Sequence, residues 1–214
     1  QGVRAASAIL AYLEANAAES LKLIGDLEFY KVSNSLVLDE ATRANLELIS
    51  SHQGDRNGSL LALLDCTRTA MGARRLRRWL LYPLLEPKDI VARHNAVQEL
   101  VENFSLRQEL KAGLAKVQDL ERLAARVVSG SALPKDLIAI KDTLSAVNEI
   151  RRQLEGFYAD LLTWLHGKLP AIPEVAALIE RAIVDDPPFS PKQGGFMRAG
   201  FDPELDEIRD MRFH

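Results

Sequence analysis

A long region of helical periodicity constrains the fold more than any other feature of the chain. From Leu60 to about Ile183, apolar residues recur at steps of three and four, the spacing that places them on one face of an α-helix. Prolines suited to a first helical turn divide this region into separate helices, at Pro87, Pro134 and Pro173. The pattern predicts a mainly α-helical fold, a bundle of several helices.

The same spacing assigns faces and bounds inside this region. On the helix that begins at Pro87, the residues expected to face inward are Ile90, His94, Val97, Leu100 and Val101. A later helix is expected from about residue 154 to residue 166. These assignments rest on local spacing alone.

A few short β-strands are expected outside the helical region. One group is expected near the N-terminal part, over residues 29–38, where two apolar runs flank a polar break. The other is expected near residues 189–200, where prolines and two adjacent glycines exclude a continuous helix and residues 196–199 suit one arm of a hairpin. Asp202 followed by Pro203 predicts the start of a further helix.

Composition bounds the class of protein. The 214 residues are 47% hydrophobic and 27% charged, which is typical of a globular protein, and the net charge is −3. We find no apolar run near the length of a membrane span and expect no membrane partner. Cys66 is the only cysteine, expected as a buried thiol, and with no secretory signal it predicts a cytoplasmic protein. The chain lacks a starting Met and ends in MRFH, so we expect a piece of a longer protein.

No catalytic motif is found in the sequence. The phosphate-binding pattern GxxxxGK[ST] is absent, because Gly167 and Lys168 are followed by Leu169. GxGxxG and HExxH are absent too, and the four histidines have no ligand spacing. We therefore expect no catalytic, cofactor-binding or metal-binding residues in this chain.

The most charged segment lies within residues 70–81, which read as an amphipathic helix. Its apolar stripe, about 120° wide and expected to enter a core, comprises Gly72, Ala73, Leu76, Trp79 and Leu80. Glycine inside a helix costs about 1 kcal/mol relative to alanine, so Gly72 indicates close approach of another backbone. The rest of the circumference carries Arg74, Arg75, Arg77 and Arg78.

Two interpretations of these arginines remain open. The favoured one is a solvated or ion-paired face, because arginine forms bidentate pairs with carboxylates. The alternative is contact with nucleic-acid phosphates, with Arg75 and Arg78 as candidate DNA contacts. No aromatic residues interleave the arginines to stack bases, and the chain as a whole is acidic, which counts against this alternative.

The arginine-rich segment resembles a signature of the MutS family of DNA mismatch repair proteins. The matching residues include Leu64, Asp65, Thr67, Thr69, Gly72, Arg74, Leu76, Trp79, Leu80, Pro83 and Leu84. Further matches follow in the family's order: Ile90 to Leu100, Asp119, Glu121 and Arg122, Pro134 to Leu137, and Gly200 to Arg209. The acidic Asp119 and Glu121 are candidates to pair with an outward arginine, Arg74 first.

The resemblance implies a position in a larger protein. Residues 1–25 would be the tail of a connector domain, residues 26–200 the first part of the core or lever domain, and residues 201–214 the start of the first clamp helix. The piece itself would be non-catalytic. The full-length protein would be an ATPase that uses ATP, ADP and magnesium. It would bind mismatched double-stranded DNA as a homodimer, close as a clamp and recruit MutL.

Other functions stay open at this point. The chain could be an independent helical module that binds nucleic acid through the arginines, or one that binds protein partners. Within the family, a branch that acts on recombination lacks the mismatch-reading domain. The segment GFDPELDEIR, residues 200–209, resembles the start of a clamp and favours the repair branch.

Overall fold

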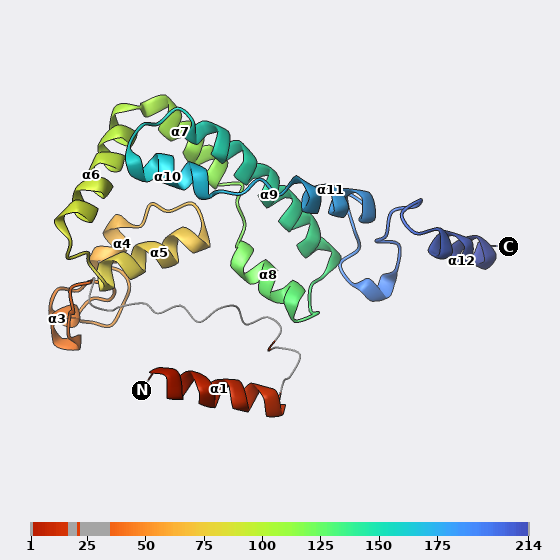
Figure 1. Cartoon of the computed structure of the whole chain (residues 1–214), viewed down its shortest axis with the longest axis horizontal. Coiled ribbons are helices and arrows are strands. Elements are labelled where there is room, and N and C mark those ends of the chain that lie inside the picture. The colour runs from red at the N-terminus through yellow and green to blue at the C-terminus, as the bar shows by residue number, and fades with distance from the viewer. Residues whose placement is uncertain (1, 17–20, 22–34, 214) are drawn as a thin grey trace. The chain divides into compact units, whose positions relative to one another are not determined.

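The computed structural model describes residues 2–16, residue 21 and residues 35–213, and the chain divides into two units between Ser33 and Asn34 (Figure 1). The described part of the first unit contains the helix α1 (Gly2–Asn16), none of whose residues is buried. The boundary expected at residue 25 and the apolar run at residues 29–32 lie outside the described residues.

The second unit is helical, which confirms the predicted class. Its α-helices, within the described residues, are α3 (Glu40–Asn45), α4 (Leu60–Leu64), α5 (Ala70–Leu81), α6 (Pro87–Glu102), α7 (Phe104–Leu114), α8 (Leu120–Val128), α9 (Pro134–Leu154), α10 (Asp160–Lys168), α11 (Pro173–Ala182) and α12 (Pro203–Phe213). A short 3-10 helix, η2, spans Pro191–Gln193. The prolines predicted to open helices do so, because the first residue of a helix needs no N–H partner.

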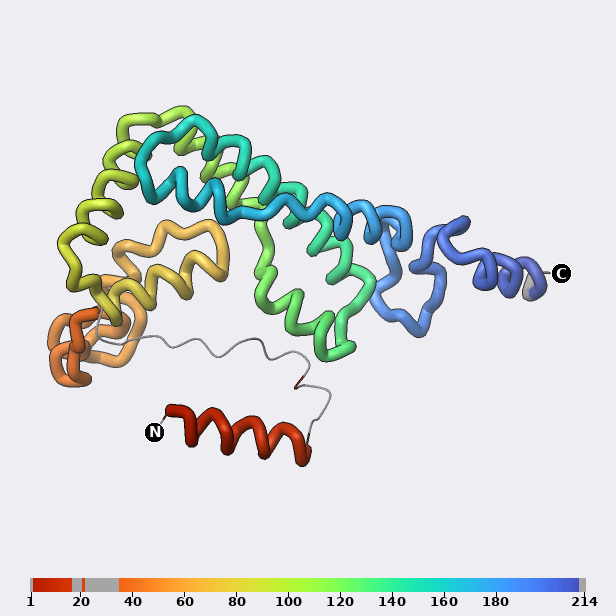
Figure 2. Tube along the Cα trace, in the orientation of Figure 1, coloured from red at the N-terminus to blue at the C-terminus, as the bar shows by residue number. Residues whose placement is uncertain are grey.

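The helix α9 is the central element of this unit. It has 21 residues, which corresponds to a length of about 30 Å. It packs against α7, α8, α10 and α11, as the tube in Figure 2 shows. The interior is therefore arranged along α9 as two apolar clusters.

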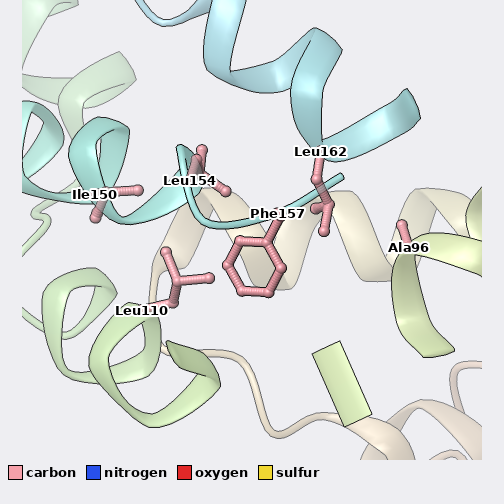
Figure 3. Close-up of a cluster of buried hydrophobic side chains, with 6 residues drawn as sticks. All are labelled: Ala96, Leu110, Ile150, Leu154, Phe157 and Leu162. Atoms are coloured by element: carbon pink, nitrogen blue, oxygen red, sulfur yellow. The ribbon is translucent and has the colours of Figure 1, made fainter. Parts of the chain in front are cut away.

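One cluster lies around the C-terminal half of α9 (Figure 3). It joins α6, α7, α9 and α10 through six buried side chains: Ala96, Leu110, Ile150, Leu154, Phe157 and Leu162. The other lies around the N-terminal half of α9 and comprises Leu123, Ile140, Ile179, Ala182 and Ile183. Burial of such side chains supplies the main driving force for the fold.

A buried polar contact lies between the two clusters. Thr143 on α9 is fully buried, and its hydroxyl oxygen accepts a hydrogen bond from the backbone N–H of Gln118 at 3.2 Å. Buried polar groups are stable only when they are paired. This contact ties the segment before α8 to the middle of α9.

The expected short strands are reduced to isolated bridges within the described part of the chain. Ser35 pairs with Leu84, and Ile183 pairs with Met197, each in antiparallel sense. The second bridge joins the chain leaving α11 to the segment expected as one arm of a hairpin, and is flanked by a hydrogen bond from the N–H of Arg198 to the carbonyl of Ala182 at 2.7 Å. Residues 36–38 form no strand, because their neighbours offer no ladder of partners.

The helix expected from about residue 154 was placed wrongly. Leu154 ends α9, and α10 begins only at Asp160. The turn between them is held from α6, because the two carboxylate oxygens of Glu99 accept the backbone N–H groups of Tyr158 and Ala159, both at 2.7 Å. A partner about sixty positions away in sequence thus determines where α10 begins.

Candidate functional site

The arginine-rich helix α5 begins at a side-chain cap. Thr69 is the N-cap, and its hydroxyl oxygen accepts the N–H of Gly72 at 2.9 Å. A Cβ atom at position 72 would lie 2.9 Å from that same oxygen and 3.6 Å from Cβ of Thr67. The expected approach of another backbone is therefore wrong: the space that Gly72 leaves is used by two threonine side chains.

The apolar stripe of α5 is only shallowly covered. Gly72, Ala73, Leu76 and Leu80 are half-buried, whereas Trp79 is 38% exposed. No residue of α5 is fully buried, and the helix packs mainly on α4. The stripe was expected to enter a core, but no residue of α5 belongs to either apolar cluster of the described residues.

The four arginines of α5 follow one another around one arc of the helix. At 100° per residue, Arg78 lies between Arg74 and Arg75, about 40° from the first and about 60° from the second. Arg77 lies about 60° beyond Arg74, and Trp79 lies about 40° beyond Arg75. All four arginine side chains are exposed. Arg77 and Trp79 therefore mark the two ends of this arc.

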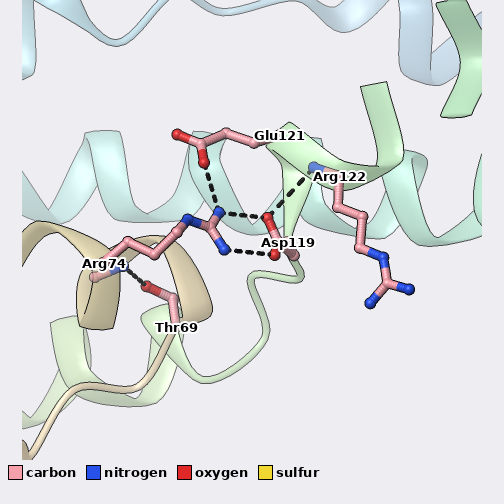
Figure 4. A network of polar contacts seen from close by, with 6 residues as sticks. Thr69, Arg74, Asp119, Glu121 and Arg122 are labelled. Atoms are coloured by element: carbon pink, nitrogen blue, oxygen red, sulfur yellow. Dashed lines mark hydrogen bonds and ion pairs between the residues drawn. The ribbon is translucent and has the colours of Figure 1, made fainter. Parts of the chain in front are cut away.

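Arg74 joins α5 to the start of α8 (Figure 4). Its two terminal nitrogens donate to the carboxylate of Asp119 at 2.9 and 2.8 Å, and one of them also donates to Glu121 at 2.5 Å. Asp119 is also the N-cap of α8 and accepts the N–H of Arg122 at 3.4 Å. The pairing that the sequence predicted is present, and one carboxylate serves both the ion pair and the helix cap.

The protonation equilibria reflect this arrangement. Hydrogen bonding from Arg74 lowers the pKa of Asp119, and the N–H of Arg122 acts in the same direction. The hydrogen bonds to Asp119 and Glu121 raise the pKa of Arg74. The ionised pair is therefore the stable form, and Arg74 is engaged with protein carboxylates.

The Arg74 side of α5 borders an open hollow of about 510 Å³. Its lining comprises Ile49, Ser50, Gly54, Arg56, Leu61, Asp65, Ala73, Arg74 and Arg77. Asp65, at the end of α4, accepts hydrogen bonds from the hydroxyl of Thr67 at 2.6 Å and from its N–H at 3.2 Å, and forms an ion pair with Arg56. The hydrogen bonds from Thr67 lower the pKa of Asp65, with a smaller contribution from Arg56. Asp65 and Thr67 therefore shape the turn that leads into α5.

The Trp79 end of the arginine arc on α5 carries a cation–aromatic contact. The guanidinium of Arg93, on α6, lies 3.8 Å from the centre of the Trp79 ring, and that of Arg75 lies 5.9 Å from it. Burial lowers the pKa of Arg93, and the positive charge of Arg75 lowers it further. Aromatic residues therefore do accompany the arginines, although the sequence spacing did not suggest it.

The helix α5 ends at its junction with the first isolated bridge. Tyr82 is the C-cap, and the carbonyl of Pro83 accepts the N–H of Leu36 at 2.9 Å. Arg43 of α3 lies over the Tyr82 ring at 5.4 Å. The end of α5 is thus fixed by the segment that precedes α3.

A further group of contacts had no sequence signal. Arg198 donates to the carbonyl of Ile183 at 3.1 Å and to Asp185 at 2.9 Å. Arg209 on α12 donates to the carbonyl of Met197 at 3.0 Å and to Asp206 at 3.2 Å. Carbonyl partners are set by the folded backbone and not by residue type, so spacing in the sequence could not indicate them.

The described residues contain no cluster of side chains suited to a metal ion. No group of three His, Cys, Asp or Glu side chains among them could hold a metal. Cys66, expected to be buried, is an exposed free thiol, because it lies in the turn between α4 and α5. None of the helices in the described ranges is long and apolar enough to cross a membrane.

Comparison with known proteins places the chain in a family. The family described as MutS domain III matches residues 41–211. A DNA mismatch repair protein MutS of Symbiobacterium thermophilum is 48% identical over 206 residues, which cover 96% of this chain and 24% of that protein. Proteins of the same description from Acaryochloris marina and Acetivibrio thermocellus are 42% and 40% identical, each over 97% of this chain and 24% of the relative. The chain spans about a quarter of the length of these relatives.

Proposed function

This chain belongs to the MutS family of DNA mismatch repair proteins, and from that premise we propose that it is the non-catalytic core, or lever, part of a longer protein of this type. In that protein it couples the nucleotide state of a distant ATPase part to the closing of a clamp on mismatched DNA. Residues 1–25 belong to the connector, residues 26–200 to the first part of the lever and residues 201–214 to the first clamp helix. The match to MutS domain III over residues 41–211 supports the lever assignment for residues 41–200.

The observation that carries the proposal is the joint between Arg74 and Asp119. It links helices whose contacting residues are 45 positions apart in sequence, and it is bidentate, so it fixes orientation as well as distance. Because Asp119 also caps α8, a rotation of α5 relative to α8 would disturb the first turn of α8. Such a joint suits a part that transmits rotation.

A continuous set of contacts extends from this joint along α9. Arg126 on α8 donates to Asp136 in the first turn of α9 at 2.8 Å, and Asp136 also accepts the N–H of Leu133 at 2.8 Å. Leu123 of α8 lies in the same apolar cluster as Ile140 of α9 and Ile179 of α11. Packed helices of this kind move as nearly rigid bodies.

The set of contacts continues to α12. The bridge between Ile183 and Met197 follows α11, and Arg209 of α12 donates to the carbonyl of Met197. The carboxylate of Asp206, also on α12, accepts the N–H of Gly200 at 2.6 Å. Movement of α11 is thereby communicated to the helix that we assign to the clamp.

Partners and cofactors belong to the proposed full-length protein. Mismatched double-stranded DNA, a second copy in a homodimer and MutL are its proposed partners, and ATP, ADP and magnesium are its proposed ligands. Among the described residues, no group of His, Cys, Asp or Glu side chains could hold a metal ion, and no contact of this chain is assigned a step in hydrolysis.

The test uses the full-length protein with Arg74→Ala and Arg74→Lys. Release from an open-ended G·T-mismatched duplex after addition of ATP is followed by fluorescence anisotropy, beside steady-state ATP hydrolysis. We expect Arg74→Ala to slow ATP-triggered release several-fold while mismatch binding without ATP persists. Arg74→Lys keeps the charge but not the bidentate geometry, so its effect should be intermediate.

The matched control is Arg77→Ala. This substitution removes an exposed arginine of the same helix, and Arg77 has no carboxylate within ion-pair distance among the described residues. It should release DNA like the wild-type protein. Circular dichroism melting of each variant separates loss of coupling from loss of folding. Normal ATP-triggered release by a folded Arg74→Ala variant would overturn the proposed role of the joint.

A further inference from the structure

One side of α5 carries exposed positive charge that the described part of the chain does not neutralise. Arg75, Arg78 and Trp79 lie on this side, and Arg93 of α6 covers the Trp79 ring; we call these four residues the basic–aromatic surface. No carboxylate lies within ion-pair distance, 4.0 Å, of Arg75, Arg78 or Arg93 among the residues described. Arg74, about 40° from Arg78 around the same helix, has two carboxylate partners.

The stack presents arginine in a form ready to bind an anion. A guanidinium stacked on an aromatic ring lies in a plane parallel to the ring, so its N–H groups point outward in its own plane and can donate a bidentate pair. Arg93 lies 3.8 Å from the centre of the Trp79 ring, and Arg75 approaches the same ring at 5.9 Å. Two like charges on one ring repel each other, and the lowered pKa of Arg93 reflects this repulsion as well as burial. An anion bound between them would relieve the repulsion.

The residue types favour a protein ligand over a nucleic acid. Exposed tryptophan, tyrosine and arginine are the residues that dominate protein–protein interfaces, and Tyr82 extends the surface by one turn with 43% of its area exposed. The Trp79 ring is already covered by Arg93, so its face is not free to stack a base.

We propose that the basic–aromatic surface binds an acidic segment of the same longer protein, outside residues 1–214, in which Asp or Glu side chains stand beside an apolar side chain. The inference rests on the proposed function, because it requires the remaining three-quarters of a MutS-type protein. The carboxylates pair with Arg75, Arg78 and the free edge of Arg93, and the apolar side chain covers the exposed part of Trp79. The surface thus docks another part of the protein onto the lever.

The test is zero-length crosslinking of the full-length protein that carries Arg75→Lys or Arg78→Lys. A water-soluble carbodiimide joins the new amine to a carboxylate in direct contact, and peptide mass spectrometry identifies the partner. We expect a crosslink to an Asp or Glu outside residues 1–214, formed without DNA or nucleotide and at least several-fold more abundant than from the control. Arg77→Lys, on the other side of α5, is the matched control.

Arginine footprinting with p-hydroxyphenylglyoxal on the unsubstituted full-length protein gives a second readout. Arg75 and Arg78 should be modified several-fold more slowly than Arg77, and duplex DNA should not change the ratio. Protection that appears only when DNA is added would overturn the proposal and indicate a phosphate contact. Equal modification of the three arginines, with no crosslink above the control, would also overturn it. Neither readout uses ATP-triggered release. Failure of the docking proposal is therefore distinguishable from failure of the proposed lever function.

Discussion

Arg74 donates two parallel hydrogen bonds to Asp119, at 2.9 and 2.8 Å, and thereby connects two helices that share no apolar cluster. The acceptor is also the cap of α8, so the loss of either side chain alters both the ion pair and its surroundings. Each group is partly exposed, and surface ion pairs contribute little unless their geometry is bidentate. The bidentate geometry, and not the charge alone, is therefore expected to determine how much this ion pair contributes to stability.

Arg74→Ala and Asp119→Ala are predicted to be non-additive in their effect on stability. If the two side chains act as one unit, the double variant should lose less stability than the sum of the two single variants. Urea unfolding of the wild type, both single variants and the double variant measures this difference. Arg77→Ala combined with Asp119→Ala is the control pair and should be additive. Additive losses in the first pair would show that the contact does not stabilise the fold.

The stability of the chain should depend on Asp119 in a defined pH range. The pKa of Asp119 is lowered in the folded state, so its contribution is present above the ordinary pKa of about 3.9 and is lost as pH falls through the lowered value. Asp119→Asn should therefore lower the melting temperature at pH 7, and the difference from wild type should shrink below about pH 4.

Thermal melts between neutral and acidic pH measure this dependence. Glu180→Gln is the control. Glu180 is an exposed residue on α11, and its carboxylate forms no ion pair with a positively charged side chain among the described residues. Its curve should follow the wild type at every pH. A difference in melting temperature between Asp119→Asn and the wild type that stayed constant down to acidic pH would contradict the lowered pKa of Asp119.

Thr143→Val should destabilise the chain although it keeps the shape of the side chain. The substitution removes the hydroxyl oxygen that accepts the N–H of Gln118 in a fully buried position. The loss of one hydrogen bond of this kind costs about 0.5–1.5 kcal/mol. The free energy of unfolding in urea is the measurement, and Thr143→Ser, which keeps the hydroxyl, should lose less than Thr143→Val. The reverse order would mean that packing, and not the hydrogen bond, sets the requirement.

Adjacent aromatic residues give a matched test of the cluster at the C-terminal half of α9. Phe157 is 4% exposed and Tyr158 is 86% exposed. Phe157→Ala should lower the free energy of unfolding by about 3–5 kcal/mol, because it removes a buried ring and leaves a cavity. Tyr158→Ala should change it by less than about 0.5 kcal/mol. Similar losses in the two variants would show that the cluster is not packed as described.

Glu99→Ala should loosen the start of α10. It removes the carboxylate that accepts the N–H groups of Tyr158 and Ala159, and loss of a comparable cap costs about 1 kcal/mol. Amide hydrogen exchange at these two residues should become faster, while exchange in α11 should not change. Glu99→Gln keeps one acceptor oxygen and should give an intermediate rate. Unchanged exchange in Glu99→Ala would exclude the capping role.

Much of the helical architecture follows from local sequence. A proline at the first helical position begins α6, α9, α11 and α12, because proline fixes φ and lacks an N–H where none is needed. The helical projection of residues 70–81 placed the four arginines outside correctly, and complementary charge correctly selected Arg74 and Asp119 as partners. These features depend on spacing and residue type, both of which the sequence states directly.

The faces of the helices were decided by tertiary structure. On α6, Val97 and Val101 were expected to face inward and are 53% and 57% exposed, and His94 is exposed as well. Ala96 is buried instead, in the cluster that contains Leu162 of α10. A small side chain allows α10 to approach α6 closely, and periodicity cannot tell which of two apolar stripes receives that neighbour.

The sequence by itself determined the helical class, the family, the helix starts and the separation of apolar from charged residues along α5. Only the tertiary structure decided that Arg93 stacks on Trp79, that Glu99 accepts the backbone of the turn before α10 and that Arg209 donates to the carbonyl of Met197. The reason is physical. Helix starts and helix faces arise from interactions within a few residues, whereas each of these contacts joins groups brought together only when separate elements pack.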